Sequence, residues 1–131
     1  MKTYPEGEYP KREITEKIIK AAFAVHNKLG SGFVEKVYEN AMAKELKSTG
    51  LAVEQQKPVN VIYGGKPVGD FSVDLLVEES VVVELKAVRI MEKSYEDKLL
   101  HYLKASNLPV GLLLNFGNSS VQIKRKVYSN K

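Results

Sequence analysis

The sequence predicts an α/β fold in which a mixed central sheet of about five strands is flanked by helices. Three observations predict it. Apolar residues recur at helical spacing in two stretches between about 13 and 47, and the period then changes to two from about 53 to 87. A third helical segment separates those strands from an apolar run at 110–116 and a final alternating segment. The expected element order is therefore α-α-β-β-β-α-β-β.

The length and composition indicate a single domain, which we place at residues 13–128, behind an extended arm at residues 1–12. Two prolines and a glycine within the first ten residues predict the arm, and 131 residues are enough for a sizeable core. The chain has no cysteine, which excludes disulfides and thiolate chemistry. No apolar run approaches the ~20 residues of a membrane span, and the polar start does not resemble a signal peptide. We therefore expect a cytoplasmic protein. Its net charge of +4 favours a polyanionic partner only mildly.

Single apolar stripes predict the first two helices. The first begins near Glu13, carries apolar residues at three- and four-residue spacing, and ends at Gly30. The second covers about Val34–Lys47 and is closed by Gly50. His26 lies within the first helix, where a partly buried or surface histidine is a more common role than a metal ligand.

Three strands are predicted between residues 53 and 87. The first alternates irregularly at its start, and Gly64-Gly65 turns the chain into a second strand at 68–77. The odd positions of that second strand are apolar and are expected to share the core face: Phe71, Val73, Leu75 and Val77. The third strand, 81–87, also sorts by parity into an apolar face and a mixed face.

The loop between the second and third strands determines which side chains face each other. A three-residue loop after Val77 would pair it with Val81 in an antiparallel hairpin. That register places Asp74 opposite Glu84 on the mixed face, with β-carbons about 5 Å apart, and Lys86 projects from the same face. Facing carboxylates repel unless a cation bridges them or one is protonated, which favours a binding site over a solvated surface. A simple salt bridge from Lys86 to one of the acids is the alternative.

A last helix and two strands complete the predicted sheet. Ser94 is the expected N-cap of the helix, with Asp97 three residues later. The run at 110–116 is apolar on both faces, as in a central strand, and 121–127 alternates with lysines that suit an exposed edge. The helix is long enough for a crossover, so the strands at 81–87 and 110–116 can pair in parallel.

Taken together, these segments resemble the PD-(D/E)XK nuclease superfamily, and within it the small proteins named GxxExxY after their signature. Here the signature reads Gly32-Phe33-Val34-Glu35-Lys36-Val37-Tyr38, and the match runs from about Ile14 to Arg125. It also includes Asp74, the Glu84-Leu85-Lys86 motif and the segments LLHYLKAS and GLLLNFG. The order in which these motifs occur is more specific than any one of them. The resemblance implies a restriction-endonuclease-like core and a metal-dependent nuclease activity.

The resemblance also implies roles for individual residues. Asp74 and Glu84 correspond to metal-binding acids, with the Leu85 carbonyl as a backbone ligand. Lys86 corresponds to the catalytic lysine, and Glu35 to the helical acid that completes the site. The implied cofactor is Mg²⁺ or Mn²⁺, which suits oxygen ligands. Five further residues are candidates for contact with the substrate: Tyr38, Lys98, Tyr102, Lys124 and Arg125.

One position departs from the family pattern. The third helix of relatives usually carries a glutamine before Leu-Leu, whereas this chain has Lys98 before Leu99-Leu100. A lysine there could contact phosphate, or it could repel Lys86 and weaken catalysis. The neighbouring His101 is expected to be a helix-surface residue.

Three functions remain open from the sequence. The first is a Mg²⁺-dependent nuclease that acts on DNA, with Glu35, Asp74, Glu84 and Lys86 as its site. The second is a catalytically weak or inactive binding or assembly module with the nuclease fold, which Lys98 favours. The third, with the least support, is a metal-dependent hydrolase of another phosphate-containing substrate. No membrane partner is expected, and a homodimer is expected only by analogy to small nucleases. Both DNA and RNA stay open as substrates, and no motif indicates a cellular pathway.

Overall fold

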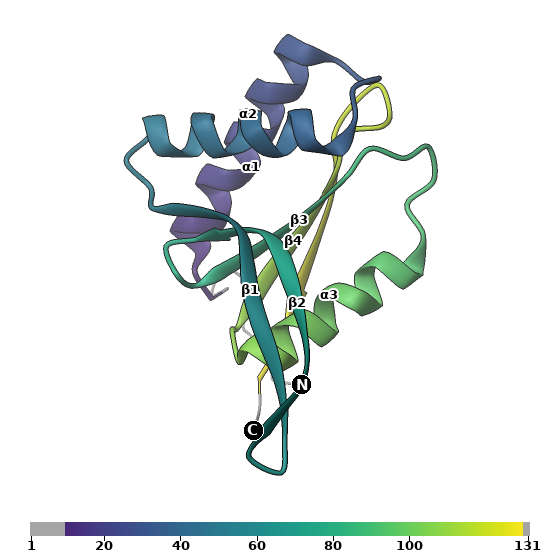
Figure 1. The fold of residues 1–131 in the computed structure, drawn as a ribbon. Coiled ribbons are helices and arrows are strands. Elements are labelled where there is room, and N and C mark those ends of the chain that lie inside the picture. The colour runs from purple at the N-terminus through teal and green to yellow at the C-terminus, as the bar shows by residue number, and fades with distance from the viewer. Residues whose placement is uncertain (1–9, 130–131) are drawn as a thin grey trace.

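A computed structural model describes residues 10–129, and its elements follow the predicted order (Figure 1). Within this range the helices and strands are α1 (Arg12–Leu29), α2 (Glu35–Ser48), β1 (Val53–Tyr63), β2 (Lys66–Val77), β3 (Val81–Lys86), α3 (Lys93–Ser106), β4 (Val110–Asn115) and β5 (Gln122–Val127). Residues 1–9 of the expected arm at residues 1–12 lie outside the described residues, and Arg12 is the first residue of α1. Within residues 10–129, no helix combines the length and the apolar character needed to cross a membrane.

The strands of the described chain form a five-stranded mixed sheet in the order β1-β2-β3-β4-β5. β3 and β4 pair in parallel because α3 carries the chain back along the sheet, and the other neighbours are antiparallel. The predicted register of the β2–β3 hairpin is confirmed, since Val77 pairs with Val81. All six residues of β4 are buried, as expected for a central strand that helices cover on both faces.

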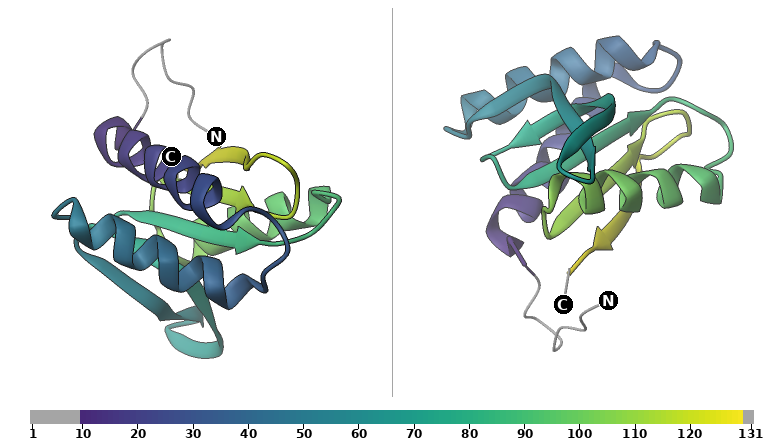
Figure 2. Two further views of the ribbon diagram at one scale, coloured as in Figure 1. Left: turned by 90° about the horizontal axis from the view of Figure 1, so that it is seen from above. Right: turned by 60° about the horizontal axis from the view of Figure 1, so that its bottom comes forward.

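Helices cover both faces of the sheet (Figure 2). The apolar stripes of α1 and α2 pack on one face, against alternate residues of β3 and β4. α3 packs on the other face through Leu99 and Leu103, which meet Val82 and Leu113. Gly111 in β4 makes room for this contact, because a β-carbon at that position would lie 2.8 Å from Cδ1 of Leu99. The two cores are therefore separated by the sheet itself.

Strand β2 changes face along its length, so the prediction that its odd residues share one face is wrong. Leu75 and Val77 lie in the core under α1 and α2, whereas Phe71 and Val73 pack with α3. The break falls at Asp74. The β1 residue beside it is Gln56, whose φ of 50° is in the left-handed region and interrupts the regular alternation of side chains.

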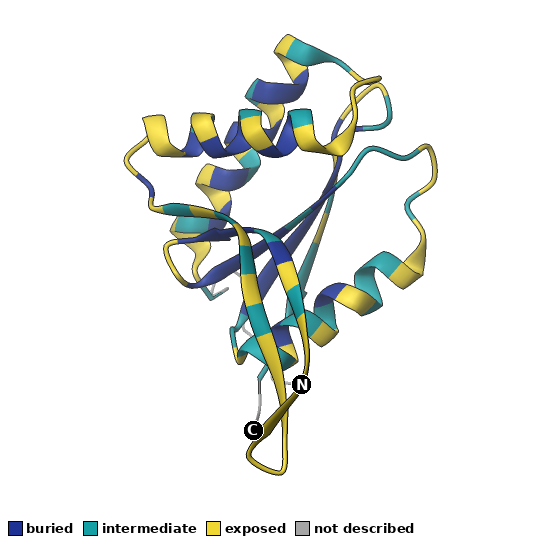
Figure 3. Ribbon diagram, in the orientation of Figure 1, coloured by how far each residue is buried: buried dark blue, intermediate teal, exposed yellow. Residues whose placement is uncertain are grey.

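The segment beyond this break, residues 57–73, is called the outer hairpin below. It extends beyond β3, since the β2–β3 pairing stops at Leu75 and Val83 whereas the β1–β2 pairing continues. Figure 3 shows that this segment is largely exposed, and Figure 1 shows that it projects beside α3. Its inward side chains, including Val59 and Phe71, contact the α3 layer only. The outer hairpin and α3 therefore form one side of the molecule.

Helix α3 begins one residue before Ser94, so the prediction of Ser94 as the N-cap is wrong. Glu92 occupies the cap position in an extended conformation with ψ of 146°, and no side chain caps the helix. Asp97, the expected partner of a Ser94 cap, instead accepts a hydrogen bond from Nζ of Lys93 at 2.9 Å. This i,i+4 contact on the exposed side of the helix takes the place of the capping interaction.

Candidate functional site

Asp74 and Glu84 lie side by side where the β2–β3 pairing ends, and each carboxyl group accepts a hydrogen bond from the backbone of the other strand. The backbone N–H of Asp74 donates to Oε1 of Glu84 at 3.1 Å, and the backbone N–H of Leu85 donates to Oδ2 of Asp74 at 2.8 Å. Side-chain carboxyl groups thus take the place of the carbonyl acceptors that a further rung of backbone pairing would supply. The result is the adjacent carboxyl pair that the register predicted, at the point where β2 changes face.

The environment of this pair opposes two negative charges. Burial raises the pKa of Glu84 to about 8, and the charge of Asp74 adds to the rise, while the Asp74 N–H and Lys86 act in the opposite direction. A divalent cation would relieve the same repulsion that a proton relieves. Two carboxylates are enough for Mg²⁺, which commonly takes one or two with waters and phosphate oxygens. The donor set of Asp74 and Glu84 therefore fits a hard cation.

Glu35 is not joined to this pair. Among residues 10–129, no group of three or more His, Cys, Asp or Glu side chains lies close enough to hold a metal ion. Glu35 is exposed in the first turn of α2. The pKa of Tyr95 is raised by its hydrogen bond with Glu92, by burial and by the charges of Glu92 and Glu35. The charge of Glu35 thus acts at Tyr95, and its carboxyl group does not join those of Asp74 and Glu84.

A different helical acid connects to the pair, and the sequence reasoning missed it. Glu39 is 4% exposed and accepts hydrogen bonds from Lys36, Gln55 and Gln56 at 2.6–2.8 Å. Burial alone would raise the pKa of Glu39, but these hydrogen bonds outweigh it and lower that pKa. Nε2 of Gln56 also donates to Oδ1 of Asp74 at 3.2 Å. Gln56 therefore links a charged acid of α2 to Asp74.

Lys86 lies in a small cleft beside the pair. Its lining residues come from β3, β4 and α3: Glu84, Lys86, Tyr95, Lys98, Leu99, Tyr102 and Leu113. Nζ of Lys86 is 4.5 Å from the centre of the Tyr95 ring, a cation–π distance. Within the described chain, Lys86 makes no ion pair within 4 Å of either carboxylate. The structure therefore does not show the simple salt bridge that was the alternative.

Lys98 lies in the same cleft, so the departure from the family pattern affects the site directly. A hydrogen bond with Tyr102 raises the pKa of Lys98, and the charges of Glu84 and Asp74 add to the rise. Its Nζ lies 5.8 Å from the centre of the Tyr102 ring. Tyr102 in turn stacks on Phe71 of the outer hairpin, with ring centres 4.2 Å apart. The cleft therefore contains two cations, with Lys98 in the place of a neutral glutamine.

Buried Asn115 holds the segment that follows Lys86. It pairs with Lys86 at the end of β4 and is 0% exposed. Its Nδ2 donates to the Val88 carbonyl and to Gln122, and its Oδ1 accepts from the backbone N–H groups of Val88 and Gly117, all at 2.8–3.1 Å. A single side chain thus fixes the point where β3 leaves the sheet. The sequence pattern carried no signal for this role.

Tyr38 is a core residue, which argues against its prediction as a substrate contact. It is 0% exposed, and its ring stacks on Phe116 with centres 4.6 Å apart. Its hydroxyl donates to the Gly30 carbonyl and accepts from the Phe33 N–H at 3.3 Å. Tyr38 therefore holds the turn between α1 and α2. His26 is also structural, with Nε2 2.8 Å from the Asn118 carbonyl oxygen.

Lys124 and Arg125 do not form one basic patch. Neighbouring residues of a strand point to opposite faces, and Arg125 donates to Oγ1 of Thr15 on α1 at 3.3 Å. Lys124 is exposed on the α3 side, where its charge helps to lower the pKa of Glu96, after the hydrogen bond from Lys126. A phosphate backbone on one face of the sheet could contact only one of the two residues.

Comparisons with known proteins address the family and the fold. A family model described as the PD-(D/E)XK nuclease superfamily matches residues 12–126. A crystal structure described as that of SSO0001 is similar in fold, with a TM-score of 0.56 and 16% sequence identity. The similarity covers 73% of this chain but only 50% of that protein, so it supports the fold alone. No curated protein matches the sequence.

Proposed function

The chain belongs to the PD-(D/E)XK nuclease superfamily, and on that premise we propose that it is a metal-dependent nuclease that hydrolyses phosphodiester bonds of DNA. One observation carries the proposal. Asp74 and Glu84 are held side by side by hydrogen bonds to backbone amides, and Lys86 lies in the cleft next to them. Side-by-side carboxylates in a partly buried position cost stability, which is consistent with a site retained for binding.

Asp74, Glu84 and the Leu85 carbonyl would hold Mg²⁺ or Mn²⁺. When bound, the ion would neutralise phosphate charge and lower the pKa of a coordinated water. The protein's own hydrogen bonds orient these ligands. The Leu85 N–H and Gln56 orient the two oxygens of Asp74, and the Asp74 N–H orients Glu84. These contacts fix the ligands before any ion binds, which reduces the cost of organising the site.

Lys86 and Lys98 supply positive charge on the open side of the cleft. Lys86 would contact a non-bridging oxygen of the scissile phosphate and stabilise the charge that develops in the transition state. Lys98 would hold the same or an adjacent phosphate, because the charges of Glu84 and Asp74 already attract it toward the cleft. Glu35 would act on the site only at a distance, through its charge at Tyr95, whose ring centre lies 4.5 Å from Nζ of Lys86.

The core position of Tyr38 supports the finer assignment to the GxxExxY group. Its hydroxyl holds Gly30 and Phe33, so the tyrosine and the loop at the start of the signature depend on each other. Gly32 in that loop has a φ of 117°, which favours glycine. The spacing of the signature therefore has a structural explanation, the stabilisation of the turn that starts α2.

Two observations favour the second candidate, a binding module without catalysis. The described chain places only two carboxylates together, and a lysine replaces the family's glutamine. Such a module would bind nucleic acid through the same two lysines. Binding that persists without cleavage is the property that separates the two candidates.

The decisive experiment measures cleavage and binding on the same substrates. The protein is incubated with single-stranded, duplex and branched DNA and with RNA, in Mg²⁺, Mn²⁺ or EDTA. Lys86→Ala should reduce cleavage at least about 100-fold. The matched control is Lys20→Ala, which removes an exposed lysine of α1 and should leave cleavage unchanged. Equal cleavage by wild type and Lys86→Ala would indicate a contaminant, and binding without cleavage would establish the binding module.

A further inference from the structure

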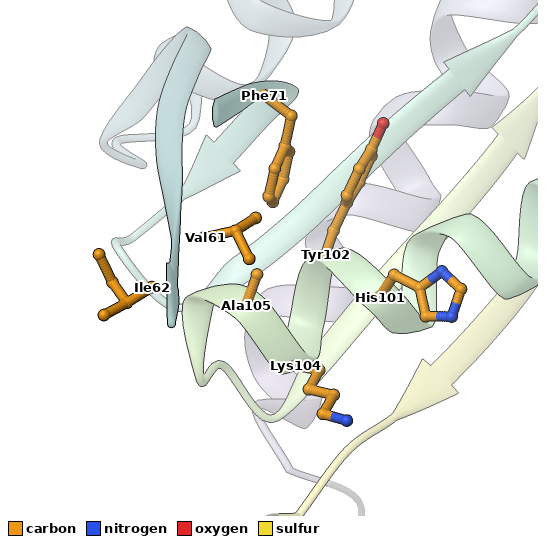
Figure 4. Close-up of a pocket in the computed structure, with 7 residues that line it drawn as sticks. All are labelled: Val61, Ile62, Phe71, His101, Tyr102, Lys104 and Ala105. Carbon is orange, nitrogen blue, oxygen red and sulfur yellow. The ribbon is translucent and has the colours of Figure 1, made fainter. Parts of the chain in front are cut away.

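A groove lies between the outer hairpin and α3, on the same side of the sheet as the cleft (Figure 4). Its volume is about 480 Å³, within the usual range for ligand sites. Both elements contribute to its lining: Val61, Ile62, Phe71, His101, Tyr102, Lys104 and Ala105. In Figure 4 Val61 and Phe71 of the hairpin point toward the α3 residues, which form the other wall, and Phe71 and Tyr102 lie in parallel planes. Ile62 lines the rim, and its side chain points to the outer side of β1.

The lining combines apolar surface with positive charge. None of these seven residues carries a carboxylate, and Lys104 supplies a cation at the edge. Ile62 is 58% exposed and Val61 39% exposed, so the hairpin presents its aliphatic side chains to solvent. A contiguous apolar surface with a charged rim is a feature of interaction sites. The ligand that suits it is anionic at its edge and flat and apolar at its centre.

The groove is continuous with the candidate catalytic cleft. Tyr102 lines both, and Lys98, which contacts Tyr102, belongs to the cleft with Lys86. A polynucleotide strand with a phosphate at Lys86 and Lys98 would therefore pass Tyr102 and enter the groove. Lys98 and Lys104 are both exposed on α3, so cations lie at both ends of this path.

Resting on the proposed function, we propose that this groove binds the unpaired bases of a single-stranded polynucleotide on its way to the cleft. Base faces are apolar and stack on aromatic rings, and they are available only when the strand is unpaired. A duplex presents mainly phosphates and sugars to a protein surface, and these have no partner on an aliphatic and aromatic lining. Duplex DNA would reach the cleft only where its strands are separated.

The sequence offers a direct spectroscopic test because it contains no tryptophan. Val61→Trp places a single fluorophore in the groove, and the matched control Phe23→Trp places one on α1, at a residue that is 46% exposed. Oligo-dA and oligo-A of 12 nucleotides, and a duplex of equal length, are added in EDTA so that no cleavage occurs. Either single strand should quench the fluorescence of the Val61→Trp protein by about half through base stacking. The duplex should quench it several-fold less, and the Phe23→Trp protein should not respond.

A second variant tests the energetics by fluorescence anisotropy of labelled single strands. Val61→Asp should weaken binding about tenfold, the cost of one lost base contact with added charge repulsion, whereas Phe23→Asp should not. Equal quenching by duplex and single strand, no quenching despite binding, or unchanged affinity of Val61→Asp would each overturn the proposal. A fluorescence change that depends on protein concentration alone would assign the groove to a second copy of the chain and also overturn it. Because these measurements need no metal, their failure leaves the nuclease assignment to be decided by the cleavage test.

Discussion

The carboxyl pair should make the metal-free protein less stable as pH rises, and Glu84→Gln should remove this effect. Glu84 ionises near 4.5 in the unfolded chain, whereas in the folded protein burial and then Asp74 raise its pKa to about 8. Between these values folding takes up a proton, so the stability that Glu84 contributes is complete below pH 4.5. It is lost as pH rises through 8. Glutamine keeps the shape and still accepts the hydrogen bond from the Asp74 N–H, but it cannot ionise.

The size of this loss of stability follows from the difference between the pKa of Glu84 in the unfolded chain and its pKa in the folded protein. With about 1.4 kcal/mol for each pH unit, the loss is under ~1 kcal/mol at pH 5, about 3 kcal/mol at pH 7 and between about 4 and 5 kcal/mol at pH 9. The free energy of unfolding of Glu84→Gln relative to wild type should rise by those amounts along the pH scale. Mg²⁺ at about ten times its Kd should return roughly 1.4 kcal/mol to the wild type and little to the variant.

Urea denaturation from pH 5 to pH 9, in EDTA and in Mg²⁺, measures these differences. The matched control is Glu54→Gln, which alters an exposed β1 glutamate that pairs with Lys57 at 3.0 Å. Its difference from wild type should be small at every pH. The reasoning would be refuted if Glu84→Gln and the wild type lost stability in parallel as pH rose. That result would mean that Glu84 is solvated and not confined against Asp74.

Two further substitutions separate structural from positioning roles. Tyr38→Phe should lower the free energy of unfolding by about 1–2 kcal/mol, because the backbone groups of Gly30 and Phe33 lose their partner. Urea denaturation measures this loss of stability. Weaker DNA binding at unchanged stability would instead indicate that Tyr38 contacts the substrate. Gln56→Ala should weaken Mn²⁺ binding about tenfold in calorimetry, because Asp74 loses an orienting hydrogen bond. Gln55→Ala, which loses contacts to α2 alone, is the control, and an equal effect of both would limit Gln56 to supporting α2.

Most of the fold could be predicted because the spacing of apolar residues differs between helices and strands. The change from helical spacing to alternation located each element, and the length of one loop fixed the register that pairs Val77 with Val81. That register is by itself enough to bring Asp74 and Glu84 together. Local patterns were sufficient here because a hairpin relates residues that are close in sequence.

The missed features depend on information that the pattern does not contain. The face change of β2 follows from the left-handed backbone of Gln56, and glutamine does not signal such a conformation. The contacts of Gln56 to Glu39 and Asp74 join three elements, so no spacing rule reveals them. The role of Asn115 likewise depends on loops that meet only in the folded chain.

The positions of three predicted substrate contacts could have been inferred from the sequence. Tyr38 lies on the apolar stripe of α2, so helical spacing favoured the core position that the structure shows. The family signature drew attention to it as a substrate contact instead. Lys124 and Arg125 are adjacent in a strand, and parity already assigns adjacent residues to opposite faces. In both cases the local geometry was a better guide than the residue type.

The break in β2 at Asp74 has a consequence for how such proteins can diverge. Beyond it, Val59, Phe71 and Val73 belong to the α3 layer and contribute nothing to the core under α1 and α2. Selection can therefore lengthen, shorten or rewrite the outer hairpin without disturbing the larger core or the carboxyl pair at its base. Under the proposed function, preference for one nucleic acid over another and the chemistry of cleavage would then evolve as separately adjustable traits.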